Sequence, residues 1–144
     1  MTEFDLDQFL PYRLSVVASR VSREFAARYS RRSGLSIPEW RVMAHLSQED
    51  AVSVRELHLR ADLEKSKASR AAAKLETAGL IVKRTNPSDK RLVELSLTEK
   101  GRSLMGELIP LALSYETEVL KGLSRDEREM FDKVLTALLR RDSC

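Results

Sequence analysis

The pattern Ser-x-x-Glu occurs three times in this chain, at residues 36–39, 53–56 and 124–127. In such a capping box the serine hydroxyl accepts the N–H of the third helical residue, and the glutamate carboxylate accepts the N–H of the serine. Apolar residues at helical spacing follow each box, so three helices are predicted to begin at these serines. The chain is therefore expected to be built mainly of helices.

A long amphipathic helix is expected before the first box, ending near Gly34. Its apolar residues recur at intervals of three and four: Leu10, Leu14, Val17, Val21 and Phe25. Residues 64–80 are rich in alanine and include Gly79, a typical C-cap, so they predict a helix after the one that begins at Ser53.

Two short runs of β-type residues, 80–84 and 92–97, follow the alanine-rich segment. The sequence Asn-Pro-Ser-Asp at 86–89 separates them, which is typical of a turn between two strands. A hairpin of this length buries little surface and is marginally stable by itself. Its tip is basic, which raises the question of what it contacts.

Two further helices complete the order. Thr98 is the expected N-cap of a long helix, which Pro110 should kink or locally interrupt. The last helix is expected from Ser124 to about Arg140. The predicted fold class is therefore mainly α with a small β-hairpin (α+β), in a single domain of 144 residues.

Positive charge is concentrated in one part of the sequence. The chain has 25 basic and 22 acidic residues, a net charge of +3. Residues 65–91 hold eight basic and two acidic residues, a net +6, which leaves the remainder at −3. Such a local positive field favours a polyanionic partner, most often nucleic acid, although a solvated charged surface would have the same composition.

The alanine-rich helix has two different sides when residues 65–76 are placed at 100° per residue. The side expected to pack inward carries Ala68, Ala71, Ala72 and Leu75. The opposite side carries Ser66, Ser69, Arg70 and Ala73, with Lys67 and Lys74 on one edge and Lys65 on the other. This outward side is either a basic surface that confers solubility or a DNA-reading surface.

The outward side has the chemistry that a major-groove helix needs. Arg70 can donate two hydrogen bonds to guanine, and the serines can bond bases or phosphates. The lysines at 65, 67 and 74 can neutralise phosphates, which gives affinity without sequence information. Because the preceding helix ends only a few residues earlier, the two predict a helix-turn-helix, and the hairpin that follows makes it a winged one.

The hairpin tip is expected to contact DNA beside that helix. Arg91 can enter a narrow minor groove, where negative potential is concentrated, and Lys90 can meet a phosphate. Asp89, two residues from Arg91, either braces its guanidinium through a charge-assisted hydrogen bond or only caps the turn.

Residues 66–101, "SKASRAAAKLETAGLIVKRTNPSDKRLVELSLTEKG", resemble the recognition helix, wing and following helix of MarR-type transcriptional regulators. The matching residues are Leu75-Glu76, Gly79-Leu80, Asp89, Arg91, Leu97-Thr98 and Gly101. The first helix, the segment "LSIPEWRVMAHL" and the two C-terminal helices match the family's order, so the resemblance covers nearly the whole chain. Glu64 departs from it, since a serine would be the better N-cap.

The resemblance implies a homodimer that binds a pseudo-palindromic operator in double-stranded DNA as a regulator, more specifically a repressor. It divides the domain into a winged helix-turn-helix lobe at 36–97 and dimerisation helices at 1–34 and 98–144. The residues agree, because the helix after Thr98 has apolar side chains on more than one face, and surplus apolar surface usually marks an interface.

The resemblance also implies that a small aromatic or phenolic effector releases the DNA. Arg13 lies at the edge of the first helix's apolar stripe, where a cation needs a partner, and a carboxylate effector would supply one. An interface salt bridge, or an arginine that extends to water, would explain it equally. Trp40 could form an aromatic wall of the site, or be a core residue.

Other function classes have little support. We find no sequence motif of an enzyme. His45 and His58 lie on different helices without the spacing of metal ligands, so neither a metal nor another cofactor is expected. Cys144 cannot form an internal disulfide, and no signal peptide or membrane-spanning run is present, which predicts a bacterial or archaeal cytosolic, nucleoid-associated protein. An architectural nucleic-acid-binding protein without an effector remains the alternative.

Overall fold

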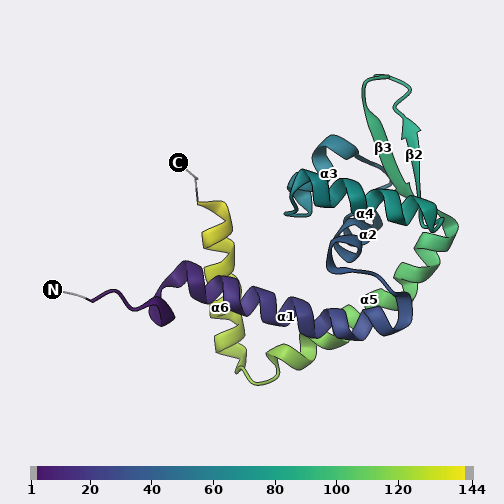
Figure 1. Ribbon diagram of the computed structural model, residues 1–144. Helices are drawn as coiled ribbons and strands as arrows, with labels where there is room; N and C mark the ends of the chain where they lie inside the picture. Colours follow the sequence, from purple (N-terminus) through teal and green to yellow (C-terminus); the bar gives the residue numbers. More distant parts are fainter. Residues whose placement is uncertain (1–2, 142–144) are drawn as a thin grey trace. The chain divides into compact units, whose positions relative to one another are not determined.

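The computed structural model describes residues 3–141. A short 3-10 helix, η1, precedes six α-helices and three strands (Figure 1). In chain order they are η1 (Leu6–Gln8), α1 (Leu10–Ser33), α2 (Ile37–Gln48), β1 (Val52–Ser53), α3 (Val54–Arg60), α4 (Lys65–Thr77), β2 (Ile81–Thr85), β3 (Val93–Leu97), α5 (Glu99–Leu120) and α6 (Arg125–Arg140). The predicted fold class, mainly α with a small β element, is confirmed.

The sheet has three antiparallel strands in the order β1-β3-β2. Leu95 of β3 lies opposite Val52 of β1 on one side and Lys83 of β2 on the other. The β2–β3 hairpin agrees with the predicted strands to within a residue and is drawn as the two arrows that follow α4 in Figure 1. The sequence did not predict β1, because two residues carry no detectable alternation.

The chain divides into two compact units, Met1–Ile109 and Pro110–Cys144, which are described separately. In the first unit, α4 packs against α2 and α3. The core includes side chains at most 2% exposed from both helices and strands, among them Val42, Met43, Leu46, Leu57, Leu75, Leu95 and Leu108. Small alanines on α4 let its backbone approach α2 closely, so the outward side of α4 is held on a rigid support.

The three predicted capping boxes are present to different degrees. Ser36 and Ser124 each accept the N–H of the glutamate three residues on, and each glutamate accepts the serine N–H in return. Ser53 accepts the Glu56 N–H at 3.2 Å, but the Glu56 carboxylate bonds Arg60 at 2.9 Å instead. All three helix starts are therefore confirmed, with one box only half formed.

The end of α4 is tied to the start of α5 by a compact set of hydrogen bonds. The Thr98 N–H donates to the Leu80 carbonyl at 3.0 Å, and the Thr98 hydroxyl donates to the Gly79 carbonyl at 2.6 Å. The same hydroxyl oxygen accepts the Gly101 N–H at 3.1 Å, so Thr98 is the N-cap that the sequence predicted. Lys100 Nζ donates to the Ala78 carbonyl at 2.8 Å.

The helix α5 continues through Pro110, so of the two predicted effects, a kink or a local break, the break is wrong. The boundary between the two compact units nevertheless falls between Ile109 and Pro110. A proline inside a helix removes one backbone hydrogen bond without preventing the helix from continuing.

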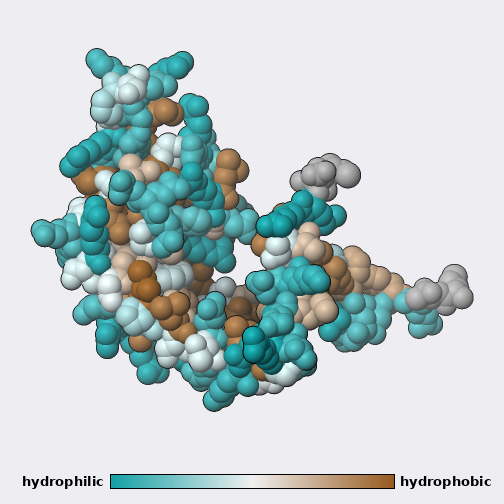
Figure 2. Space-filling view, turned by 180° about the vertical axis from the view of Figure 1, so that it is seen from behind, coloured by the Kyte–Doolittle hydropathy of each residue, from teal (hydrophilic) through white to brown (hydrophobic). Residues whose placement is uncertain are grey.

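Many large apolar side chains outside the lobe core are exposed in the single chain, and Figure 2 shows apolar residues on one face of the surface. On α1 they are Leu10, Leu14 and Val17; on α5 they are Ile109, Leu113 and Val119; on α6 they are Met130, Phe131, Val134, Leu135 and Leu139. None of the helices in the described part of the chain is long and apolar enough to span a membrane.

Candidate nucleic-acid interface

Burial along α4 follows the predicted division of its surface. Ala68, Ala71, Ala72 and Leu75 are all buried, and every residue assigned to the outward side or its edges is exposed: Lys65, Ser66, Lys67, Ser69, Arg70, Ala73 and Lys74. The helix begins after Glu64, whose side chain makes no capping hydrogen bond. The outward side therefore presents three lysines, an arginine and two serines to solvent.

The turn between α3 and α4 holds the two helices in a helix-turn-helix. Asp62 takes a positive φ of 52°, a conformation that aspartate tolerates better than most residues. Arg41 of α2 donates from Nη1 to the Asp62 carbonyl at 3.3 Å. The N–H of Leu63 donates to the His58 carbonyl at 3.0 Å. No local sequence pattern predicts the contact from Arg41, which links residues 21 positions apart.

Two hollows flank α4, one along each edge of its outward side. The first, of about 290 Å³, lies between α3 and α4 and is lined by Val54, Arg55, Leu57, His58, Lys65, Ala68 and Ser69. The second, of about 250 Å³, lies between the start of α2 and α4 and is lined by Ser36, Pro38, Glu39, Lys67, Arg70, Ala71 and Lys74. Ser66 and Ala73 line neither hollow and lie on the ridge between them.

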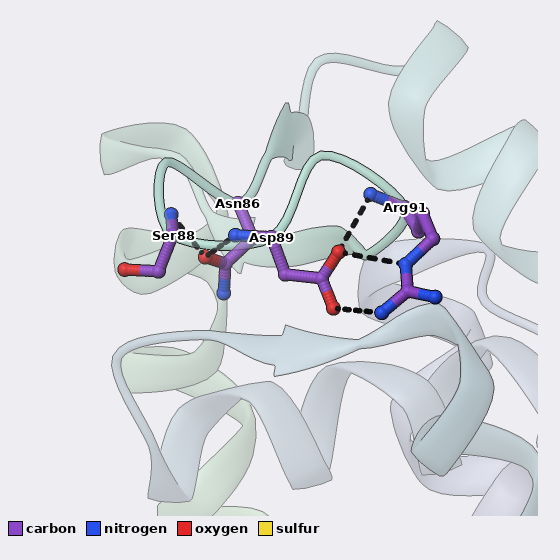
Figure 3. A network of polar contacts seen from close by, with 4 residues as sticks. All are labelled: Asn86, Ser88, Asp89 and Arg91. Atoms are coloured by element: carbon purple, nitrogen blue, oxygen red, sulfur yellow. Dashed lines mark hydrogen bonds and ion pairs between the residues drawn. The ribbon is translucent and has the colours of Figure 1, made fainter.

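The tip of the β2–β3 hairpin is ordered by Asn86 (Figure 3). Its side-chain oxygen accepts the N–H of Ser88 at 2.7 Å and of Asp89 at 3.1 Å. Its amide nitrogen donates to Glu94 on β3, and its backbone N–H donates to the Leu92 carbonyl at 2.9 Å. The sequence identified this segment as a turn but did not single out Asn86 as its centre.

Asp89 contacts Arg91 through three hydrogen bonds, which Figure 3 shows. The carboxylate accepts the Arg91 N–H at 3.0 Å, Nε at 3.2 Å and Nη2 at 3.4 Å. These bonds to the Arg91 side chain and backbone lower the pKa of Asp89 below its usual value, and the charge of Arg55 on α3 lowers the pKa further. The same carboxylate thus both caps the turn and holds the guanidinium, the two roles that the sequence left open.

The two residues considered for an effector site lie in different places. Arg13 is exposed on the N-terminal half of α1. Trp40 is half-buried and packs on Phe25 and Tyr29, near the other end of α1, with ring centroids 5.1 and 5.3 Å apart. Phe25 follows Arg13 by twelve residues, about 18 Å along a helix axis. Within one chain, therefore, Arg13 and Trp40 do not share a site.

A larger hollow of about 570 Å³ lies between the end of α2 and the N-terminal part of α5. Its lining combines apolar and charged side chains: Leu46, Met105 and Ile109 with Glu49, Asp50 and Arg102. The sequence did not identify Arg102, because nothing in its spacing separates it from other exposed helical arginines. Within residues 3–141 no group of three His, Cys, Asp or Glu side chains could hold a metal ion, and Cys144 lies outside the described residues.

Comparison with known proteins identifies relatives of this architecture. Residues 33–92 match the sequence profile of the MarR family. The transcriptional regulator HosA of Escherichia coli O111:H- is 27% identical over 105 residues, which cover 73% of this chain and 78% of HosA. These relatives are transcriptional regulators, which confirms the expectation that the chain is not an enzyme.

Solved structures extend the likeness to nearly the whole chain. The MarR family transcriptional regulator SPO1453 from Silicibacter pomeroyi DSS-3 is 28% identical with a TM-score of 0.82, covering 95% of this chain and 97% of that one. BpsR of Bordetella bronchiseptica, whose DNA binding is regulated by 6-hydroxynicotinic acid, is 20% identical with a TM-score of 0.85, covering 98% and 100% of the two chains, and shares the fold. With its helix-turn-helix, its wing and these matches, the chain is similar in sequence and fold to the MarR family of winged helix-turn-helix transcriptional regulators.

Proposed function

We propose that this MarR-like regulator binds a pseudo-palindromic DNA operator as a homodimer and acts as a repressor. The observation that carries the proposal is the two-sided α4, whose alanine side is buried against the lobe while its basic and serine-rich side is exposed. A bound dimer would exclude other proteins from the same DNA segment. Two α4 helices related by a two-fold axis would enter successive major grooves about 34 Å apart.

The proposed dimer rests on the apolar side chains that remain exposed on α1, α5 and α6 of the single chain. Soluble monomers rarely expose contiguous apolar patches of this kind without a partner. A second copy that covers these helices, residues 1–34 and 98–144, leaves the lobe at 36–97 free to contact DNA. The outward side of α4 and the tip of the wing then face the same duplex.

The residues of the proposed interface have different roles. Arg70 contacts base edges in the major groove, Ser66 and Ser69 bond bases or phosphates, and the lysines at 65, 67 and 74 contact phosphates. In the wing, Arg91 enters the neighbouring minor groove while Asp89 holds it, and Lys90 contacts a phosphate. Base contacts specify the sequence, whereas phosphate contacts supply salt-dependent affinity.

Selection from random DNA duplexes tests this function. The purified protein is expected to enrich an inverted repeat whose half-sites lie one helical turn apart. Arg70→Ala should lower affinity and relax the preference at one base position of each half-site, by roughly 1–3 kcal/mol. Arg91→Ala should weaken binding with less change in preference. An Arg70→Ala protein that enriches the same repeat with unchanged stringency would contradict the role given to Arg70.

A small aromatic acid is the proposed effector. The support is chemical: BpsR, which has the same fold, is regulated by an aromatic acid, and Arg13 offers a cation on the exposed apolar stripe of α1. The half-buried Trp40 supplies an aromatic surface. Because the two residues do not share a site within one chain, the Arg13 beside Trp40 would belong to the other copy of the dimer. The ligand must bind the free form more tightly than the DNA-bound form.

The effector proposal is tested by titrating 6-hydroxynicotinic acid and other aromatic acids into the protein–DNA complex. The Arg13 site would be supported if an aromatic acid releases DNA from the wild type but not from Arg13→Ala, and if Arg13→Ala still binds DNA. Arg102→Gln is the matched comparison, because it removes a cation from the hollow between α2 and α5. Indifference of the wild type to every such acid would favour an architectural DNA-binding protein without an effector.

A further inference from the structure

We propose that the hollow between α3 and α4 is a binding site for one DNA backbone phosphate, held by Arg55, Lys65 and Ser69 with His58 on its wall. This site deepens the proposed function and rests on it. Arg55 and His58 belong to α3 and lie outside the basic segment 65–91, so they extend the interface to a second helix.

The hollow has the form that an anion site on a surface requires. Its floor is apolar and rigid, because Leu57 and Ala68 are 1% and 4% exposed and belong to the packed core of the lobe. Its rim is polar, with Arg55 and His58 contributed by α3 and Lys65 and Ser69 by α4. A volume of about 290 Å³ admits a phosphate together with the water that remains on it.

The charge of this hollow distinguishes it from the one on the other edge of α4. The seven residues that line it include Arg55 and Lys65 but no carboxylate, whereas Glu39 lines the hollow beside Lys67. Two cations from different helices that converge on one space repel each other until an anion enters. The site therefore attracts a phosphate without a competing negative side chain on its own wall.

The position of the hollow links it to the wing. The helix α3 packs against β3, the second strand of the wing, and the charge of Arg55 on α3 lowers the pKa of Asp89 at the wing tip. A phosphate bound by Arg55 would lie between the major groove read by α4 and the minor groove entered by Arg91. Such a contact fixes the register of the protein on the duplex and carries no sequence information.

The test measures binding to the enriched duplex over a salt series. Loss of one phosphate contact lowers the slope of log K against log[salt] by about 1, and the proposed dimer carries two copies of the site, so Arg55→Gln and Lys65→Gln are each expected to lower it by about 2. Arg55→Lys should keep the slope. Arg60→Gln is the matched control on the same helix, since Arg60 is already paired with Glu49 and Glu56 and should leave the slope unchanged.

A duplex series in which single phosphates are replaced by neutral methylphosphonates locates the contact. At one position in each half-site, the methylphosphonate should weaken binding of the wild type. The same replacement should not further weaken binding of Arg55→Gln, which already lacks that contact. If Arg55→Gln responds to every substitution as the wild type does, and keeps the wild-type slope, the phosphate site is refuted while DNA binding stands. A wild type that binds no duplex at all would refute the proposed function and this site with it.

Discussion

Replacing Gly101 with alanine should disrupt the connection between α4 and α5. Gly101 lies in the first turn of α5, and a Cβ added there would fall far inside van der Waals distance of the Leu80 carbonyl oxygen. The same Cβ would lie 3.2 Å from the Leu80 carbonyl carbon and 3.3 Å from Cδ2 of Leu97. Because the obstacle is backbone rather than a flexible side chain, either α5 or the end of α4 must move.

The cost follows from what that movement disturbs. Overpacking a well-packed site costs about 1–3 kcal/mol. The Leu80 carbonyl also accepts the Thr98 N–H, and a weakened hydrogen bond adds about 1 kcal/mol. The gain in helix propensity from glycine to alanine offsets at most about 1 kcal/mol. A net loss of about 2 kcal/mol is expected, or roughly 4–8 °C in Tm for a chain of this size.

Gly106 provides a matched control on the same helix. A Cβ at Gly106 meets nothing within 4 Å, so Gly106→Ala should stabilise the protein by about 0.5–1 kcal/mol. Urea unfolding followed by circular dichroism, at one protein concentration because dimer stability depends on it, measures both variants. Gly101→Ala that is as stable as the wild type, or Gly106→Ala that is equally destabilised, would refute the steric reasoning.

The remaining predictions concern three side chains, Tyr29, Ser124 and Asn86. Tyr29→Phe should stabilise the protein, because the buried Tyr29 hydroxyl has no hydrogen-bond partner among the described residues; a loss of stability in urea unfolding would contradict this. Burial raises the pKa of Tyr29 to about 12, above that of the unfolded chain, so the wild type should lose stability relative to Tyr29→Phe as the pH rises from 10 to 12. Ser124→Ala should cost about 1 kcal/mol by removing the N-cap of α6, and unchanged unfolding would argue against that cap. Asn86→Ala should accelerate hydrogen exchange at the amides of residues 88 and 89, whereas Ser88→Ala should leave the Asp89 amide protected.

Local sequence signals predicted the elements of the fold well. The capping boxes at Ser36 and Ser124 and the N-cap at Thr98 are satisfied by residues three positions away, so the information needed is contained in a few neighbouring residues. The burial of Ala68 and Leu75 likewise follows from helical periodicity alone. Helix starts and helix faces are therefore readable from this chain without tertiary contacts.

Features that depend on distant residues were not predictable. The strand β1 has two residues and exists because Val52 pairs with Leu95 across 43 positions. Arg55 joins Lys65 and Ser69 around one hollow only when α3 packs on α4, and an exposed arginine on a short helix gives no sequence signal. Arg13 and Trp40 were considered for one site because periodicity specifies faces, whereas the packing of Trp40 on Phe25, twelve residues beyond Arg13 on α1, appears only in three dimensions.

Changing the spacing of the two half-sites tests whether two α4 helices related by a two-fold axis read DNA one turn apart. Affinity is measured for the enriched inverted repeat and for the same repeat with five base pairs inserted at its centre, which places the half-sites on opposite faces of the duplex. For a dimer with fixed spacing, the insertion is expected to reduce affinity to that of a scrambled duplex at the same salt concentration. Equal affinity for both repeats would contradict a dimer with fixed spacing.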